Sequence, residues 1–264
     1  MAALTCEVQS GVALLTMSRP EARNALSAEM KSGFATIVPA IATDASIRAV
    51  VLTGAGGAFC AGGDLRGMQE VRAGMSIQAW RDRMREVQPW LRALIELDRP
   101  VIAAVDGPAF GAGFSLALAA DFVVASPRAK FCMSFMRVGL VPDFAAMYSL
   151  PRVVGVQRAK ELMLSAREVD ATEALKLGLV MEVVAQDQLL VRARALAQSF
   201  VGASALGVRL VKQGLAMALA TDLRSALADE ADHQALCFVS QEHVDAVQRF
   251  LDKEPPNFRW PAAS

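Results

Sequence analysis

Histidine and cysteine are scarce in this chain, and their scarcity excludes several kinds of site. Two histidines, His233 and His243, are too few for a metal site with several histidine ligands, and they make a Ser-His-Asp triad hard to build. The four cysteines lie far apart and lack metal-ligand spacing. Such isolated cysteines are typical of reduced thiols, so we expect a cytoplasmic protein.

The chain also lacks an excess of charge and a long apolar run. Lysine plus arginine and aspartate plus glutamate both number 27, and this zero net charge gives no electrostatic basis for binding nucleic acid. No apolar run reaches the length of a membrane span, and the first residues lack the charged and apolar parts of a signal peptide. We therefore expect neither nucleic acid nor a membrane as a partner. Hydrophobic residues make up 54% of the chain, which indicates a deep core together with subunit interfaces.

The hydrophobic pattern predicts an α/β core followed by helices alone. Strands are expected as a hairpin over 3–9 and 11–17, and then at 48–53, 100–105, 121–126, 130–133 and 179–184. Helices are expected at 28–42, 76–96, 112–120, 143–150, 155–165, 170–177 and 187–200, and later at 204–219, 222–237 and 240–251. The polar residues 66–79 predict either a mobile flap or a plain surface loop. We therefore divide the chain into a core, 1–200, and a C-terminal helical region, 201–264.

Two glycine-rich turns lie about fifty residues apart, each between an apolar strand pattern and a helix pattern. The first reads AFCAGGDL at 58–65, and the second reads GPAFGAGFS at 107–115. Small residues let a ligand approach the backbone and leave N–H groups free to point at it. Two such turns can aim two N–H donors at one oxygen, which predicts an oxyanion hole for a thioester or ester carbonyl.

An oxyanion hole needs a base or a nucleophile beside it, and Asp143 is the strongest candidate. It follows a proline in an apolar stretch, GLVPDFAA at 139–146. Apolar surroundings raise the pKa of a carboxyl group, which suits it to move a proton near neutral pH. The same position before a predicted helix is also typical of an ordinary N-cap aspartate. The residues alone leave both interpretations open.

These segments resemble a known family, the crotonase superfamily of enoyl-CoA hydratases and isomerases. The resemblance spans nearly the whole chain and is carried by an ordered set of segments: MSRPEARNAL at 17–26, AFCAGGDL at 58–65, RPVIAAVDG at 99–107, GAG at 111–113, and KELML at 160–164 with GLV at 178–180. It implies a crotonase (ClpP-like) fold, which is a spiral of ββα turns with a helical C-terminal region for trimerisation. It also implies an acyl-CoA substrate, a homotrimer or a dimer of trimers, no metal, and no cofactor besides the CoA of the substrate.

The resemblance also assigns roles to individual residues. The N–H groups of Gly63 and Ala112 become the oxyanion donors, and Asp143 becomes the catalytic base. The residues that would hold CoA lie in the loop around 22–25 and in the first glycine turn: Ala22, Arg23, Ala25, Ala61, Asp64 and Leu65. For two of them a purely structural role stays open: Arg23 as a solvated loop cation and Asp64 as a helix cap. Ser115 and Phe135 complete the predicted substrate site.

A departure from the family pattern favours an isomerase. Enoyl-CoA hydratases carry two glutamates that handle water, at the positions where this chain has Ser115 and Phe135. Neither residue replaces a glutamate as a base. An aspartate at 143 is instead similar to the base of isomerase members, and the surrounding stretch is closest to the ring-epoxide isomerases of phenylacetyl-CoA breakdown.

Two other groups with this aspartate fit less well. Dienoyl-CoA isomerases pair it with a glutamate at Phe135, and chlorobenzoyl-CoA dehalogenases add a histidine at Gln88 and tryptophans at Val87 and Phe135. We therefore expect a one-base isomerase that shifts a 3-enoyl-CoA to a 2-enoyl-CoA or isomerises a ring epoxide. The alternatives are an enoyl-CoA hydratase with atypical water activation and an inactive CoA-binding protein of the same fold.

Overall fold

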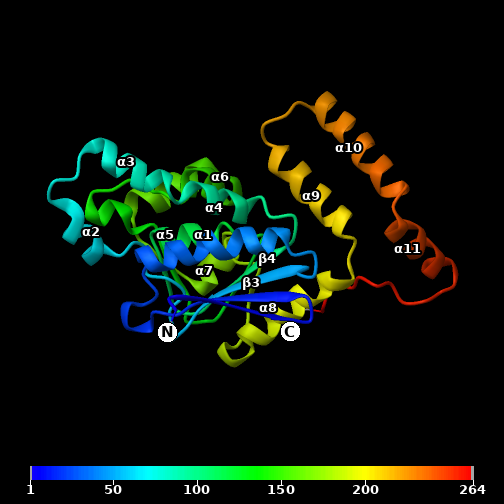
Figure 1. Ribbon diagram of the computed structural model, residues 1–264, viewed down its shortest axis with the longest axis horizontal. Coiled ribbons are helices and arrows are strands. Elements are labelled where there is room, and N and C mark those ends of the chain that lie inside the picture. The colour runs from blue at the N-terminus through cyan, green and yellow to red at the C-terminus, as the bar shows by residue number, and fades with distance from the viewer. Residues whose placement is uncertain (1, 263–264) are drawn as a thin grey trace.

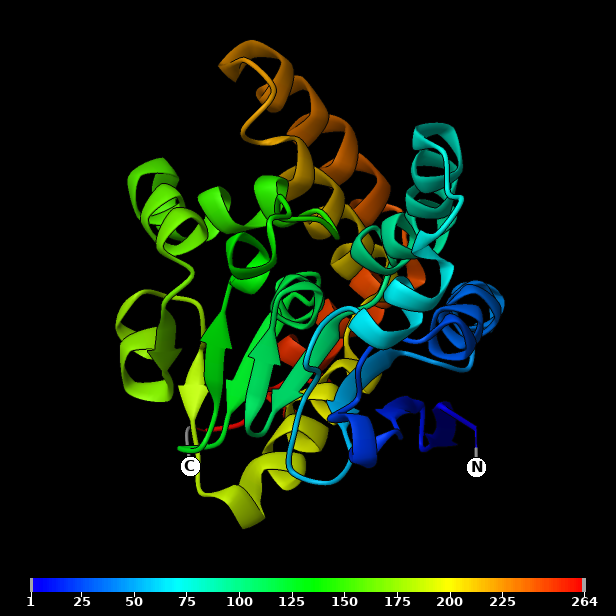
Figure 2. The same ribbon diagram turned by 90° about the vertical axis from the view of Figure 1, so that its left-hand side faces the viewer.

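A six-stranded sheet forms the centre of the protein, and the computed structural model describes residues 2–262 (Figures 1 and 2). In spatial order its strands are β1 (Leu4–Gln9), β2 (Val12–Met17), β3 (Ala49–Gly54), β4 (Val101–Val105), β6 (Phe122–Ala125) and β9 (Glu182–Val183). β1 and β2 are antiparallel, and the other neighbouring pairs are parallel. Ser10 and Gly11 join β1 to β2 with φ of 49° and 80°, as a two-residue hairpin turn requires. The predicted opening hairpin is confirmed.

Helices cover both faces of this sheet because its strand residues alternate between two apolar clusters. α1 (Ala28–Thr43), α4 (Gln88–Ile95) and α5 (Ala112–Ala117) lie on one side, and α8 (Leu189–Ser199) lies on the other (Figure 1). Val50 and Leu52 belong to the first cluster, whereas Val51 and Ile102 pack with Leu196 of α8 in the second. β3 and β4 are therefore buried on both faces, as their continuous apolar sequences predict.

A second sheet, of three strands, lies beside the first and is formed by segments between residues 108 and 170. Its strands are β5 (Pro108–Phe110), β7 (Lys130–Cys132) and β8 (Glu168–Asp170). The elements around it are η2 (Ser134–Val138), α6 (Ala146–Ser165) and α7 (Ala171–Lys176). Short helices connect the elements up to residue 202: η1 (Pro20–Ala22), α2 (Leu65–Arg72), α3 (Ile77–Arg85), η3 (Gln186–Gln188) and η4 (Phe200–Gly202).

The structure corrects three predicted elements. The single helix expected at 76–96 is two helices, α3 and α4, because Pro89 in the first turn of α4 has no N–H with which to continue the preceding helix. The polar stretch 66–79 is mostly helical, since α2 extends to Arg72 and only 73–76 connect it to α3. The two helices expected at 143–150 and 155–165 are both present within α6, on either side of the non-helical Gly155 (φ 75°, ψ 160°), but the first begins at Ala146 instead of 143 and continues to this kink.

Three C-terminal helices extend away from the sheet (Figure 1). They are α9 (Ala205–Met217), α10 (Leu223–Phe238) and α11 (Gln241–Leu251), with α9 packed against α10 and α10 against α11. Leu210 is their only buried residue, whereas Phe238 and Phe250 are 64% and 81% exposed. This change from buried to exposed residues begins near residue 200, although the boundary between 1–200 and 201–264 itself remains a prediction. No helix within residues 2–262 has the length and apolar character needed to cross a membrane.

After α11 the chain returns to the core. Arg192, 5% exposed, donates hydrogen bonds from its guanidinium to the backbone carbonyls of Pro261 (3.3 Å) and Ala262 (2.7 Å). Trp260 packs against Phe122 and Phe200, with ring centroids 5.3 and 5.9 Å apart. The chain that follows the exposed helices is thus anchored to the face of the sheet that α8 covers.

Candidate active site

Backbone hydrogen bonds join the two glycine-rich turns. The N–H of Cys60 donates to the carbonyl of Pro108 (3.0 Å), and the N–H of Phe110 donates to the carbonyl of Cys60 (2.9 Å). α5 then passes so close to the first turn that a Cβ at Gly113 would lie 2.1 Å from the Cys60 carbonyl oxygen, so glycine alone fits there. Two segments that are distant in sequence therefore meet beyond the ends of β3 and β4.

Gly63 and Ala112 present backbone N–H groups at this meeting point. Ala112 is the first residue of α5, so its N–H has no acceptor within the helix. The N–H of Gly63 donates to no backbone acceptor in the described part of the chain. A Cβ added to Gly62, whose φ is 96°, would lie 3.4 Å from the Ala112 nitrogen. Two N–H groups that have no backbone acceptor within residues 2–262 therefore lie close together.

A cavity of about 240 Å³ opens beside these two residues. Both glycine turns line it, together with residues of α1, α2, α3, η2 and the loop before α6. Six of the predicted site residues contribute to its wall: Ala61, Gly63, Leu65, Ala112, Phe135 and Asp143. Much of the wall is apolar, and Asp143 is its only carboxylate among residues 2–262.

Asp143 reaches the cavity from a turn of unusual backbone geometry. The two residues after it, Phe144 and Ala145, have φ of 52° and 61°, a left-handed conformation that non-glycine residues rarely adopt and that often marks functional sites. α6 begins at Ala146 with Ala145 as its N-cap residue and no side-chain cap. The interpretation of Asp143 as an N-cap aspartate is therefore wrong.

The carboxyl group of Asp143 is only partly satisfied. Its buried oxygen Oδ1 has no hydrogen-bond partner among the described residues. Burial raises the pKa of Asp143 from its usual 3.8 to about 6, and the nearby positive charge of Lys31 acts in the opposite direction. A carboxyl group with this pKa and a free oxygen can both accept and return a proton near neutral pH.

The predicted residues of the 22–25 loop lie next to the cavity without lining it. Ala22, Arg23 and Ala25 belong to a loop that is tied to the first glycine turn, because the N–H of Ala61 donates to the carbonyl of Arg23 (2.9 Å). Arg23 has a left-handed φ of 49°, and its residue is exposed to solvent. The loop therefore lies outside the cavity wall, with a solvated cation at its tip.

Asp64 and Ser115 also lie outside the cavity wall, and both have structural partners. The Asp64 carboxylate caps α2 by accepting a hydrogen bond from the N–H of Gly67 (3.1 Å), and it pairs with Arg19 (3.1 Å). These contacts hold the pKa of Asp64 below its usual range, and the helix-cap interpretation is confirmed. Ser115 is 1% exposed, and its hydroxyl donates to the carbonyl of Gly111 one turn earlier (3.2 Å).

Three cations that carry no signal in the sequence also line the cavity. They are Lys31 of α1, Arg83 of α3 and Arg137 of η2. Lys31 directly follows Met30, which belongs to the buried apolar face of α1, so its position in the pattern is that of an ordinary solvated lysine. Only the tertiary packing of α1, α3 and η2 around the glycine turns brings these charges to the cavity.

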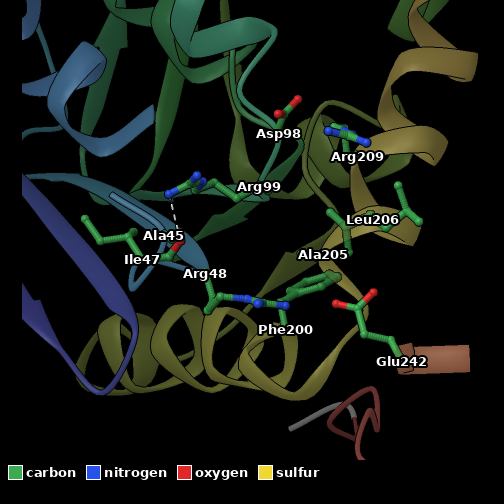
Figure 3. Close-up of a pocket in the computed structure, with 11 residues that line it drawn as sticks. Ala45, Ile47, Arg48, Asp98, Arg99, Phe200, Ala205, Leu206, Arg209 and Glu242 are labelled. Atoms are coloured by element: carbon green, nitrogen blue, oxygen red, sulfur yellow. Dashed lines mark hydrogen bonds between the residues drawn. The ribbon is translucent and has the colours of Figure 1, made fainter. Parts of the chain in front are cut away.

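A larger hollow, of about 360 Å³, lies between the core and the start of α9 (Figure 3). Its charged residues are Arg48, Asp98, Arg99, Arg209 and Glu242. Arg99 points toward Ile47 in Figure 3 and donates to its backbone carbonyl (2.8 Å), and Arg48 donates to the carbonyl of Ala203 (2.6 Å). These arginines hold the backbone where the core meets the C-terminal helices, so we place the chemistry in the smaller cavity.

Known proteins resemble this chain over almost its whole length. A sequence profile described as enoyl-CoA hydratase/isomerase matches residues 7–260. The chain belongs to that family. It is 37% identical to the protein named 1,2-epoxyphenylacetyl-CoA isomerase from Escherichia coli (strain K12), over 95% of this chain and 96% of that protein. It is 34% identical to a short-chain-enoyl-CoA hydratase from Clostridium acetobutylicum, over 94% of each chain.

A solved structure of the same family is similar throughout. The crystal structure of an enoyl-CoA hydratase/isomerase from Cupriavidus metallidurans CH34 superposes with a TM-score of 0.94 at 44% identity, covering 100% of this chain and 99% of that one. This likeness confirms the crotonase fold that the sequence resemblance implies. The chain is thus an enzyme of the crotonase superfamily, whose members act on CoA thioesters. Relatives named isomerase and hydratase both occur, so the reaction has to be argued from the cavity.

Proposed function

We propose that this enzyme is an acyl-CoA isomerase with Asp143 as its single acid-base residue. One observation carries the proposal: the cavity wall holds one carboxylate within residues 2–262, and its buried oxygen has no hydrogen-bond partner there. A 1,3 shift of a proton needs one group that takes the proton up and gives it back. The cavity provides one such group.

In this proposal the N–H groups of Gly63 and Ala112 bind the thioester oxygen. Negative charge grows on that oxygen when a proton leaves carbon 2, and two N–H donors stabilise the resulting enolate. The support is geometric, because both residues line the cavity, and neither N–H has a backbone acceptor among the described residues. Backbone groups held by the joined glycine turns need no rearrangement before they bind.

Asp143 then moves one proton between two carbons of a 3-enoyl chain. Its carboxylate removes a proton from carbon 2, and the double bond between carbons 3 and 4 conjugates with the enolate to give a dienolate. The carboxylic acid so formed returns the proton at carbon 4, which leaves the double bond between carbons 2 and 3. Asp143 ends as it began, so the shift needs no cofactor. The rings of Phe135 and Phe144 line the cavity and help to exclude water from the dienolate.

The same cavity gives little support to the two-glutamate hydration route. Phe135 places an apolar ring in the wall at one of the two positions, and Ser115 at the other is buried outside the wall with its hydroxyl bonded to Gly111. No second carboxylate among the described wall residues is available to activate or deliver water. Hydration with atypical water activation remains the rival reaction because relatives are named hydratases.

The proposal extends to CoA, subunits and location. CoA is proposed to lie along Ala22, Arg23 and Ala25, with Asp64 and Leu65 beside it, because this loop borders the cavity at the first glycine turn. The exposed apolar residues of α9–α11 support a homotrimer or a dimer of trimers. The four cysteines are free thiols, which supports a cytoplasmic location.

Asp143→Asn tests the proposal directly. We expect isomerisation of 3-hexenoyl-CoA, followed by the ultraviolet absorbance of the conjugated product, to fall by roughly 10²–10⁴-fold, because asparagine cannot take up the proton. Asp82→Asn is the matched control, since Asp82 lies on α3 outside the cavity wall, is half-exposed and accepts a hydrogen bond from Gln78 (2.8 Å). Hydration of 2-hexenoyl-CoA and isomerisation of a ring-epoxide thioester are measured in parallel.

Each outcome separates the candidate functions. Isomerisation at an unchanged rate in Asp143→Asn rules out this residue as the base. Hydration that exceeds isomerisation in the unmodified enzyme favours an enoyl-CoA hydratase. Tight binding of CoA without turnover of any of these thioesters favours an inactive CoA-binding protein.

A further inference from the structure

The charged groups around Asp143 come from three elements that wall the cavity. α1 contributes Lys31, α3 contributes Arg83 and η2 contributes Arg137, while α2 and α6 contribute no titratable side chain to the described wall. Arg137 lies 3.9 Å from a carboxylate oxygen of Glu168, and this partner offsets its charge. The guanidinium of Arg83 lies over the ring of Trp80, 5.9 Å from the ring centroid.

Lys31 differs from these two arginines in its relation to Asp143. It is partly buried, and no carboxylate oxygen of residues 2–262 lies within 4.0 Å of its ammonium group. Burial and then Arg83 lower the pKa of Lys31, and the charges of Asp143, Glu86 and Asp64 raise it again. Of the three cations, Lys31 is the one whose charge acts on the pKa of Asp143.

The position of Lys31 is fixed by helix geometry rather than by a partner. Met30, Phe34 and Val38 anchor α1 in the core, and Lys31 follows the first of these, on a part of α1 that faces α3 across a hollow. A second hollow of about 220 Å³, also lined by Lys31 and Arg83, lies behind it on the side of Trp90. The lysine therefore lies between two cavities, and its charge acts on Asp143 in one of them.

We propose that Lys31 is a positioning residue of this active site, whose ammonium charge holds the Asp143 carboxylate in the ionised form that accepts a proton. This inference rests on the proposed isomerase function. A buried carboxyl group is driven toward its neutral form, and a neutral Asp143 cannot start the shift at carbon 2. Lys31 opposes this effect through its charge, from the wall of the same cavity.

The pH profile of kcat/KM for 3-hexenoyl-CoA tests the inference in Lys31→Met, which keeps most of the unbranched side chain and removes its charge. The acidic limb, where Asp143 gains its proton, is expected to move up by about half to one pH unit. At pH values on the acidic side of the limb, kcat/KM of Lys31→Met is expected to be roughly three- to tenfold lower than that of the unmodified enzyme. Above about pH 8 the two are expected to be equal. Lys31→Arg is expected to restore the limb, and Arg85→Met, which removes an exposed cation of α3 outside the cavity, is expected to leave it in place.

Titration of the Asp143 carboxyl carbon by NMR, without substrate and assigned with Asp143→Asn, separates this inference from the proposed function. A midpoint near 6 that rises in Lys31→Met and returns in Lys31→Arg supports the role of Lys31, even if no variant isomerises 3-enoyl-CoA. An unchanged midpoint in folded Lys31→Met overturns it, even if Asp143 proves to be the base. A rate loss that is equal at every pH also overturns it, because a structural defect would act in that way.

Discussion

The cavity beside Asp143 and the hollow at the start of α9 are both lined by charged side chains, but these side chains are used differently. In the hollow, Arg99 donates to backbone carbonyls of residues 41, 42, 44 and 47, and Arg48 donates to the carbonyl of Ala203. In the cavity, Asp143 leaves a buried oxygen without a partner in the described part of the chain. Arg209 is the exception in the hollow, since its buried Nε also has no partner there.

This difference shows why size is a poor guide to the active site. The hollow is the larger of the two, at about 360 Å³ against about 240 Å³, yet two of its three arginines, Arg48 and Arg99, are committed to holding the backbone. A group whose hydrogen bonds are already made has little to offer a substrate. The free carboxylate oxygen of Asp143 and the two N–H groups, which have no acceptor within residues 2–262, can act on one. The comparison predicts that changes at the cavity affect catalysis and that changes at the hollow affect stability.

Gly113→Ala is expected to have the largest effect, because it separates the two glycine turns. The added Cβ would meet the Cys60 carbonyl oxygen at 2.1 Å, so α5 has to move and carries the N–H of Ala112 with it. We expect kcat/KM to fall by at least about a hundredfold, as for loss of an oxyanion donor. The free energy of unfolding should fall by about 2–4 kcal/mol, measured by urea denaturation.

Gly214→Ala is the matched control for this substitution. Gly214 lies inside α9, and no heavy atom of a neighbouring group lies within 4 Å of a Cβ built there. Alanine should stabilise that helix by about 0.5–1 kcal/mol and leave the rate unchanged. Full activity in a folded Gly113→Ala protein would contradict the view that the close approach of the turns sets the N–H geometry.

Arg99→Met tests the other side of the comparison. The guanidinium donates to carbonyls of Ile41 (2.7 Å), Asp44 (2.6 Å) and Ile47 (2.8 Å), which lie at or just beyond the end of α1. Loss of these charge-assisted hydrogen bonds should lower the free energy of unfolding by about 2–3 kcal/mol. At a temperature where the variant is folded, kcat/KM for 3-hexenoyl-CoA should stay within about twofold of the unmodified enzyme.

Arg92→Met is its control, because among residues 2–262 Arg92 pairs only with exposed Glu96, one turn away (2.9 Å). This substitution should change stability by less than about 0.5 kcal/mol. If Arg99→Met lost as much activity as Asp143→Asn, the catalytic groups would lie in the hollow at the start of α9 instead of the cavity beside Asp143.

Much of the fold followed from the sequence because its patterns are strong where burial is complete. The runs at 49–54 and 101–105 are apolar throughout and form the two central strands, and Ser10-Gly11 forms the hairpin turn that it predicts. β5 and β8 were missed because neither shows an apolar strand pattern: β5 begins with a proline inside the second glycine-rich turn, and β8 has one apolar residue, Val169, between two acids. The break between α3 and α4 was missed because the apolar spacing on both sides of Pro89 continues as if one helix ran through it.

The candidate site, too, has some residues that could be predicted from the sequence and others that could not. The two glycine turns and an acid among apolar residues leave a mark in the sequence, and the family resemblance then assigns the donors to Gly63 and Ala112 and the base to Asp143. The structure brings all three residues to one cavity. The left-handed backbone at Phe144 and Ala145 left no such mark, since neither residue is glycine or asparagine. Lys31 came to the cavity only through the tertiary packing that brings α1 and α3 to the same cavity wall.

The smallest predicted effect is on stability. Most substitutions lower the free energy of unfolding, whereas Asp143→Asn should raise it. In the folded state the pKa of Asp143 is raised from 3.8 to about 6, so between these values the folded protein holds a proton that the unfolded chain has released. Stability therefore falls as the pH rises through this window, and above it the ionised carboxylate weakens the fold.

Asparagine removes that charge, so the variant should exceed the unmodified enzyme by about 1–2 kcal/mol at about pH 8 and by almost nothing at about pH 4. Urea denaturation at the two pH values measures the difference, with Asp82→Asn expected to show none. A variant that loses isomerisation while gaining stability would mean that the fold gives up stability to keep an unpaired acid in the cavity. A destabilised variant at the higher pH would instead mean that the Asp143 carboxylate has a stabilising partner, as Arg99 has in the hollow.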